Sequence, residues 1–214
     1  EPSDDYQRDP VGSVSLIDRP SRLSRLRQSD VRTADFRRFS RAQLDPSVRI
    51  FGPNASVAQD LEPEYISVDK DGRRAWITLQ ENNAVAELDI RHGRITAVHG
   101  LGYKDHSLSG NELDASDKDN AVTIRNWPIR GLYQPDAISN FKHHGKTYLV
   151  TANEGDARAY SGYNEEVRLG SAAYLLDPAQ FPDATSLKQN ANLGRLTVSK
   201  ASGLNPATGT YQAI

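Results

Sequence analysis

An internal repeat is the feature that most constrains how this chain can fold, because each copy of a repeated unit adopts the same small structure. Three seven-residue segments share one pattern, in which a small or turn residue opens a short apolar run that closes on aspartate. They are GSVSLID (12–18), NAVAELD (83–89) and SAAYLLD (171–177). Each of these patterns predicts a short β-strand next to a turn.

A longer repeat precedes the second and third of these segments. PEYISVDKDGRRAWITLQEN (63–82) matches PDAISNFKHHGKTYLVTANEG (135–155) in its proline and acid, its Ile-Ser pair, its polar turn with glycine, its aromatic-led strand and its trailing glutamate. The Asp-Gly turn in DKDG favours a hairpin between ISV and AWITL. Together with AVAELDI and RITAVHG, this predicts four short antiparallel strands over 63–102, the dimension of one propeller blade.

The repeats therefore predict an all-β fold, a partial β-propeller of about three four-stranded blades with long insertions between them. Blade-like units are expected near 1–18, 63–102 and 135–177, with insertions at 19–62 and 103–134. The alternative is a β-sandwich with coincidental internal similarity. Two offset repeats in register argue against that alternative.

Composition and charge narrow the function classes. A net charge of −2 gives no overall drive toward nucleic acid or anionic membrane. No apolar run approaches the roughly 18 residues that a membrane helix needs. There is no cysteine, so neither a disulfide nor a thiol contributes. Segment 19–41 is rich in arginine, but it has few aromatic residues, which favours a solvated insertion over a polyanion-binding patch.

Carboxylates occupy equivalent places in the two long repeats. Glu64 and Asp136 follow a proline at the start of the first strand, and Glu81 and Glu154 follow the second strand. In a propeller such positions fall at one end near the central channel, so the four acids are expected to ring one opening. Carboxylates brought close together repel, which raises a pKa or recruits a cation.

Hard oxygen ligands without histidine or cysteine favour calcium, or else magnesium, over zinc or copper. The neighbouring Asn82, Asn153 and Asp156 are expected to add further oxygens. The alternative for the whole set is a group of caps and turn acids that are solvated or paired with arginine.

The loop GLGYKDHSLSGNELDASDKDN (100–120) holds a second acidic group, Asp114, Asp117 and Asp119. The calcium-loop pattern of EF-hands fails in both registers, because Ala121 or Lys118 falls where a ligand is required. These three aspartates are therefore secondary candidates, expected to reach into the blade rim.

Several long motifs resemble one known family. They are LEPEYISV, TLQENNAVAELD, GLGYKDHSLSGNELDASDKD, IRNWPIRGLYQPDAI and TYLVTANEGDAR. The chain resembles the choice-of-anchor I domain, a secreted β-propeller family that includes bacterial surface proteins and mesenchyme-specific cell surface glycoproteins. The family's domain is about twice as long, and the chain has no methionine, even at position 1. A fragment of one larger propeller, spanning 1–214, is therefore expected.

The resemblance implies a secreted, periplasmic or cell-surface location. Together with the repeat and the acidic rim, it predicts an extracellular binding or assembly role that uses divalent cations, with calcium expected. Expected partners are the remainder of the propeller or another copy of the chain, with an extracellular protein or polymer as a further partner and no nucleic acid. Some bacterial members carry an alkaline phosphatase label. The alternative function is therefore a metal-dependent phosphomonoesterase that uses the same carboxylates. No G-x-S-x-G nucleophile motif is present.

Overall fold

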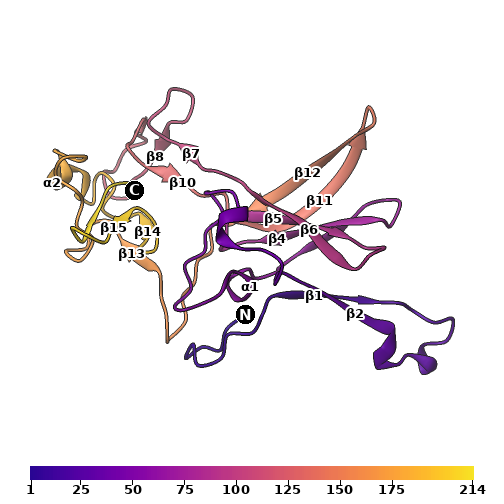
Figure 1. The fold of residues 1–214 in the computed structure, drawn as a ribbon. Coiled ribbons are helices and arrows are strands. Elements are labelled where there is room, and N and C mark those ends of the chain that lie inside the picture. Colours follow the sequence, from indigo (N-terminus) through magenta and orange to yellow (C-terminus); the bar gives the residue numbers. More distant parts are fainter. The chain divides into compact units, whose positions relative to one another are not determined.

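The computed structural model describes all 214 residues and is mostly β, built from many small antiparallel sheets (Figure 1). The chain forms two compact units. The first contains Glu1–Gly102 and Tyr133–Asp156, and the second contains Tyr103–Leu132 and Ala157–Ile214. None of the helices has the length and apolar character that crossing a bilayer requires.

A four-stranded antiparallel sheet, ordered β3-β4-β5-β6, is the centre of the first unit. Its strands are Ile66–Val68, Arg74–Leu79, Ala84–Asp89 and Arg94–Gly100. Strand β4 is buried from Ala75 to Leu79, as expected for an apolar strand with a neighbour on each side. Four antiparallel strands were predicted over 63–102, and the structure contains them.

A two-stranded sheet and a short helix complete the core of this unit. Strand β1 (Ser13–Ile17) pairs with β2 (Val31–Asp35), and β1 alternates between exposed and buried residues, so one face turns inward. Helix α1 (Val57–Asp60) begins with a capping box between Ser56 and Gln59. Three short 3-10 helices also occur here: η1 (Leu23–Arg25), η2 (Gln28–Asp30) and η3 (Arg41–Gln43).

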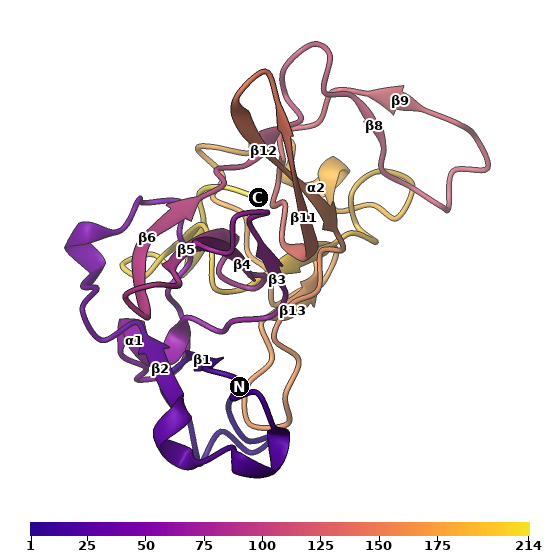
Figure 2. The same ribbon diagram turned by 90° about the vertical axis from the view of Figure 1, so that its right-hand side faces the viewer.

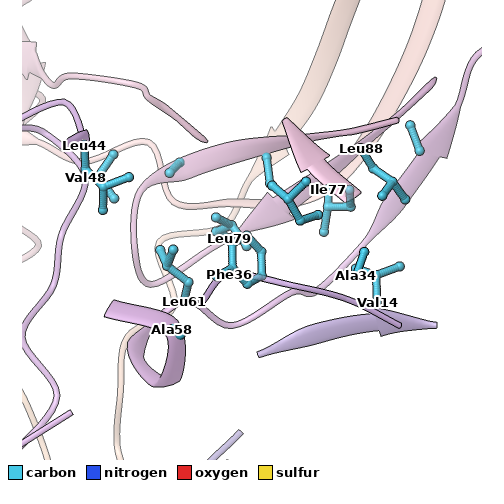
Figure 3. Close-up of a cluster of buried hydrophobic side chains, with 14 of the residues drawn as sticks. Val14, Ala34, Phe36, Leu44, Val48, Ala58, Leu61, Ile77, Leu79 and Leu88 are labelled. Carbon is cyan, nitrogen blue, oxygen red and sulfur yellow. The ribbon is translucent and has the colours of Figure 1, made fainter. Parts of the chain in front are cut away.

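Residues of the predicted 19–62 insertion contribute much of this core. Residues 21–29 are exposed, which fits the prediction of a solvated segment. The same prediction is wrong for Ala34 and Phe36, which pack with Ile77, Leu79 and other residues of the central sheet (Figure 3). The reason is that β2 pairs with β1, which points these apolar side chains at the sheet.

The longer repeat forms a second hairpin in the same unit. Strand β11 (Pro135–His143) pairs with β12 (Lys146–Asn153), just as β3 pairs with β4. Figure 2 shows β11 beyond β3 in the series β6, β5, β4, β3. The side chain of Asn140 donates to Ser67 Oγ at 2.7 Å and to the Val68 carbonyl at 3.0 Å, which joins the two hairpins.

The second unit consists of small two-stranded sheets and one short helix. It contains β7 (Lys104–Asp105) with β10 (Arg130–Gly131), β8 (Leu113–Asp114) with β9 (Ile124–Arg125), β13 (Glu166–Arg168) with β14 (Thr197–Ser199), β15 (Leu204–Asn205) with β16 (Thr210–Tyr211), and α2 (Ala184–Leu187). Its apolar cluster includes Trp127 and Ile129. Residues of the predicted 103–134 insertion thus contribute to the hydrophobic core of the second unit.

The third heptad, SAAYLLD, does not form the predicted strand. The heptads at 12–18 and 83–89 do form strands, β1 and β5. Within 171–177 only Leu176 makes a bridge, to Tyr211, while the ring of Tyr174 stacks on that of Tyr211 at 3.7 Å. Tyr174 is buried in the second unit, and a backbone hydrogen bond closes a turn from Ser171 to Tyr174. This segment therefore does not form the extended, paired strand that the pattern predicts.

The buried ring of Phe36 provides a test of this core. Phe36 is 0% exposed, so Phe36→Ala is expected to lower the free energy of unfolding of the first unit by about 3–5 kcal/mol through lost burial and a cavity. Urea unfolding followed by Trp76 fluorescence in a Trp127→Phe background measures it. Leu23→Ala, at a position that is 66% exposed, is the control and should change the free energy by less than about 0.5 kcal/mol. Equal effects of the two substitutions would contradict the packing described.

Candidate functional site

Three of the four predicted rim acids, Glu64, Asp136 and Glu154, lie in one electrostatic environment in the first unit, together with Asp156. The pKa of Glu64 is raised, first by partial desolvation of its carboxylate and then by the negative charges of Glu1, Asp136, Asp156 and Glu154. We call these five residues the acidic cluster. Although Glu64 is exposed as a residue, its carboxylate lies among like charges. The charges of Asp136, Glu154 and Asp156 thus act on Glu64. That these acids ring one opening of a propeller and bind a metal stays a prediction.

Strand β4 positions the two acids that follow a proline. The backbone amide of Glu64 donates to the carbonyl of Thr78 at 3.0 Å, and the Thr78 hydroxyl donates to the carbonyl of Asp136 at 2.7 Å. Thr78 is fully buried, so these two contacts hold the starts of β3 and β11 against the same point of β4. This is how the repeated proline-acid pairs reach one place.

A network of side-chain amides positions the two acids that follow β12. Gln80 Nε2 donates to Glu154 Oε2 at 3.3 Å, and the Glu154 amide donates to the Gln134 carbonyl at 3.3 Å. The Gln134 side chain donates to the carbonyl of Asp156. Asn83 then holds this segment, because its Oδ1 accepts from the backbone amides of Tyr133 and Gln134, at 2.9 and 3.1 Å.

Glu81, the fourth predicted rim acid, occupies a different environment. It follows β4 as predicted, but it is buried, and its backbone carbonyl accepts from Arg49 at 2.7 Å. Asn82 is also buried. Its amide group donates to the carbonyls of Arg49 and Asp60, and its oxygen accepts from the amide of Glu62. These contacts give Asn82 a structural role instead of the metal-ligand role suggested by its sequence position.

The acidic cluster is an electrostatic feature without a closed coordination shell. No three histidine, cysteine, aspartate or glutamate side chains are gathered closely enough to hold a metal ion in this structure. Asn153, another predicted oxygen donor, accepts from the Thr151 hydroxyl at 2.9 Å. The cluster thus concentrates negative charge on oxygen donors, and binding a cation requires these side chains to move together.

The secondary aspartates belong to the second unit. Arg195 binds both carboxylate oxygens of Asp117, at 2.5 and 3.1 Å, and this contact is the main reason that the pKa of Asp117 is lowered. Asp119 accepts from the amide of Ala121 at 3.2 Å. Asp114 and Asp117, together with Arg168 and Arg195, line an open cavity of about 330 Å³. Asp117 is thus paired with an arginine. Metal binding by the three aspartates stays a prediction.

Sequence reasoning did not identify Glu1, Gln80, Asn83 or Gln134 as part of this site. Glu1 lies outside both repeats, so no pattern marked it. Asn83 and Gln134 both have positive φ, 52° and 41°, in segments next to the repeated strands. The side-chain oxygen of Asn83 accepts hydrogen bonds from the backbone amides of Tyr133 and Gln134. These residues are far from Asn83 in the sequence, so this role becomes visible only in the folded structure.

These features define a mostly β repeat domain whose related hairpins share one acidic end. The chain belongs to the Choice-of-anchor I domain family, whose sequence profile matches residues 1–214. The family resemblance is therefore confirmed. No curated protein and no solved structure matches the chain significantly.

The raised pKa of Glu64 gives the first electrostatic prediction. Asp136→Asn removes one of the like charges, so the pKa of Glu64 is expected to fall toward its ordinary value of 4.5. Titration of the side-chain carboxyl carbon by NMR measures this shift. Asp18→Asn, whose carboxylate pairs with Arg32, is the control and should leave the pKa of Glu64 unchanged.

The same shift predicts how stability depends on pH. The folded state binds a proton at Glu64 more tightly than the unfolded state does, so this group makes stability fall as pH rises from 4.5 through the raised value. Asp136→Asn should reduce that fall. An unchanged pKa of Glu64 in the variant would show that the two carboxylates do not interact.

Proposed function

We propose that this domain is an extracellular binding and assembly module, built as part of a β-propeller, whose acidic cluster takes a divalent cation, with calcium preferred. One observation carries the proposal: the carboxylate of Glu64 is partly desolvated and lies among the charges of Glu1, Asp136, Asp156 and Glu154, and both effects raise its pKa. Like charges held in one place by buried contacts repel one another, and a divalent cation relieves that repulsion.

The donor chemistry supports calcium more than other metals. All the side-chain donors of the cluster are carboxylates, which are hard oxygen ligands. Calcium accepts about six to eight oxygens in flexible geometry, whereas magnesium demands a near-ideal octahedron. Since no closed shell is present, the flexible ion fits better, with water and backbone carbonyls as further donors. Magnesium is expected to bind more weakly.

The arrangement of the two related hairpins supports the propeller. The four-stranded sheet β3-β4-β5-β6 has the size of one blade, and β11 lies against β3 and β4 as the start of a second. Lys142 adds ion pairs from β11 to Asp69 at 3.2 Å and Asp71 at 3.0 Å, at the turn of the first hairpin. In a propeller, the acidic cluster would lie where the first strands of adjacent blades begin.

The family supports the proposed location and role. Membership in the Choice-of-anchor I domain family, together with the implications of the resemblance, suggests a secreted, periplasmic or cell-surface protein. Calcium is abundant outside cells, and extracellular calcium modules bind it with dissociation constants of about 10⁻⁴–10⁻³ M. A cluster without a closed shell suits that affinity range.

Calorimetric titration of the chelator-treated protein with calcium tests the proposal. We expect a dissociation constant of about 10⁻⁴–10⁻³ M, and a rise in stability of about 2.7 kcal/mol when free calcium is 100 times that constant. The pair Glu64→Gln and Asp136→Asn should weaken binding at least about tenfold, since each removes a charged ligand. Asp18→Asn is the matched control and should bind normally.

Two outcomes would decide against this function. If calcium gives no heat of binding and no change in melting temperature, the domain does not bind calcium at this cluster. Turnover of a generic phosphomonoester that is lost both with chelator and in Glu154→Gln would instead favour the metal-dependent phosphomonoesterase that the resemblance raised as the alternative.

A further inference from the structure

The loop that joins β1 to β2 carries a concentrated positive charge. It follows the last pair of the two strands, Ile17 with Val31, and Figure 1 shows it at the outer end of this hairpin. Residues 19–29 contain no aspartate or glutamate. The four arginines of this stretch are Arg19, Arg22, Arg25 and Arg27. All four are exposed, and none of their guanidinium groups forms an ion pair.

The aspartates that flank the loop are occupied by other partners. The Asp18 carboxylate pairs with Arg32 at 3.2 Å, and the Asp30 carboxylate accepts from the backbone amide of Arg27 at 2.8 Å. The second unit contains as many lysines and arginines as aspartates and glutamates, so it has no excess of negative charge. Neither the flanking residues nor the net charge of the second unit therefore neutralises the loop.

The loop also exposes two leucines in a regular arrangement. Helix η1 is closed by backbone hydrogen bonds from Arg25 to Arg22 and from Leu26 to Leu23, both 3.0 Å long. Because a 3-10 helix has three residues per turn, Leu23 and Leu26 share one side of it and Arg22 and Arg25 share another. Leu23 is 66% exposed and Leu26 is 42% exposed. Neither η1 nor η2 buries a residue, so these leucines do not serve the core.

The turn between β5 and β6 extends the positive surface. Arg32 donates to the carbonyls of Arg91 and Ile90, at 3.2 and 3.3 Å, which holds this turn beside the base of the loop. Arg91 is exposed and forms no ion pair. The acidic cluster lies at the other end of the sheet, where β3 and β11 begin. The first unit thus separates its positive and negative charges.

We propose that this loop binds the surface of a lipid bilayer that carries anionic phosphate headgroups. Guanidinium groups match phosphate oxygens in both charge and hydrogen-bond geometry. Leu23 and Leu26 then insert at the boundary between the headgroups and the acyl chains. Stable attachment of a protein to a bilayer surface takes two signals, and a basic stretch with adjacent apolar side chains supplies both.

The leucines favour a lipid surface over a soluble polyanion. Proteins that bind single-stranded nucleic acid stack its bases on aromatic side chains, and residues 19–29 include none. A soluble polyanion also offers no apolar phase to receive Leu23 and Leu26. The chain as a whole has a net charge of −2, so the attraction to an anionic surface must come from the loop and the turn beside it.

Sedimentation of the full chain with lipid vesicles tests the proposal. Vesicles that contain phosphatidylglycerol in phosphatidylcholine should bind the protein, and vesicles of phosphatidylcholine alone should not. Binding should weaken as salt rises toward about 1 M, where charges are screened within about 3 Å. Attachment rests on the extracellular location proposed above but not on the cation. A calcium chelator is therefore present throughout, so that failure of the cation site leaves this result unchanged.

Charge variants show whether the loop is the contact. Arg22→Gln and Arg25→Gln should each weaken binding to the anionic vesicles about fivefold, because each removes one arginine from the surface. The control pair Arg8→Gln and Lys118→Gln removes the same charge from exposed positions outside the loop and should bind normally.

Leucine variants separate insertion from attraction between charges. Leu23→Ser together with Leu26→Ser keeps every charge and should weaken binding about tenfold through lost apolar burial. Because the chain contains no cysteine, an environment-sensitive fluorophore can be attached at Leu23→Cys. Its emission should shift to shorter wavelength on anionic vesicles. The same label at Val122→Cys, a position in the second unit that is 83% exposed, should not shift.

Three results would overturn the proposal. The first is the absence of binding to vesicles that contain phosphatidylglycerol. The second is equal weakening by the loop pair and by the control pair, which would make the attraction a property of overall charge. The third is binding of soluble inorganic polyphosphate as strong as that of vesicles and unaffected by the leucine substitutions, which would identify a polyanion as the ligand.

Discussion

Two buried side-chain amides hold the first unit together at the point where its hairpins meet. Asn82 joins the segment around Asp60 to the end of β4, and Asn83 joins the start of β5 to Tyr133 and Gln134. Asn83 also donates to the Gly102 carbonyl at 2.6 Å. Burial makes these bonds matter, because each backbone group left without its partner would carry a desolvation cost of about 1–3 kcal/mol.

The acidic cluster depends on the contacts that these amides make. Asn83 holds Gln134, Gln134 contacts the backbone of Asp156, and Thr78 contacts the backbone of Asp136. These carboxylates are brought together by buried bonds whose partners lie elsewhere in the sheet, and their repulsion is offset by the stability of the whole unit. The divalent cation proposed above would offset part of that repulsion at this end of the unit.

The hairpins were predictable from local chemistry, and their surroundings were not. The turn DKDG and the apolar run AWITL specify β3 and β4 without outside help, and their copies specify β11 and β12. The heptad SAAYLLD carries the same pattern as NAVAELD, yet Tyr174 packs on Tyr211 and no ladder forms. A short apolar run is compatible with several packed states, and the available neighbours select one. The burial of Phe36 was not predicted for the same reason. Phe36 follows an arginine-rich stretch, and such a stretch predicts exposed residues.

The sequence by itself determined the strand-forming repeats, the family, and the recurrence of acids at the ends of the repeated strands. Only the tertiary structure decided which acids share one electrostatic environment. Glu64, Asp136, Glu154 and Asp156 do, Glu81 is buried beside the chain near Arg49, and Asp117 is paired with Arg195. The reason is physical: strand and turn preferences are short-range and can be read from neighbouring residues. A carboxylate's surroundings depend on long-range contacts, which exist only after the hairpins have packed.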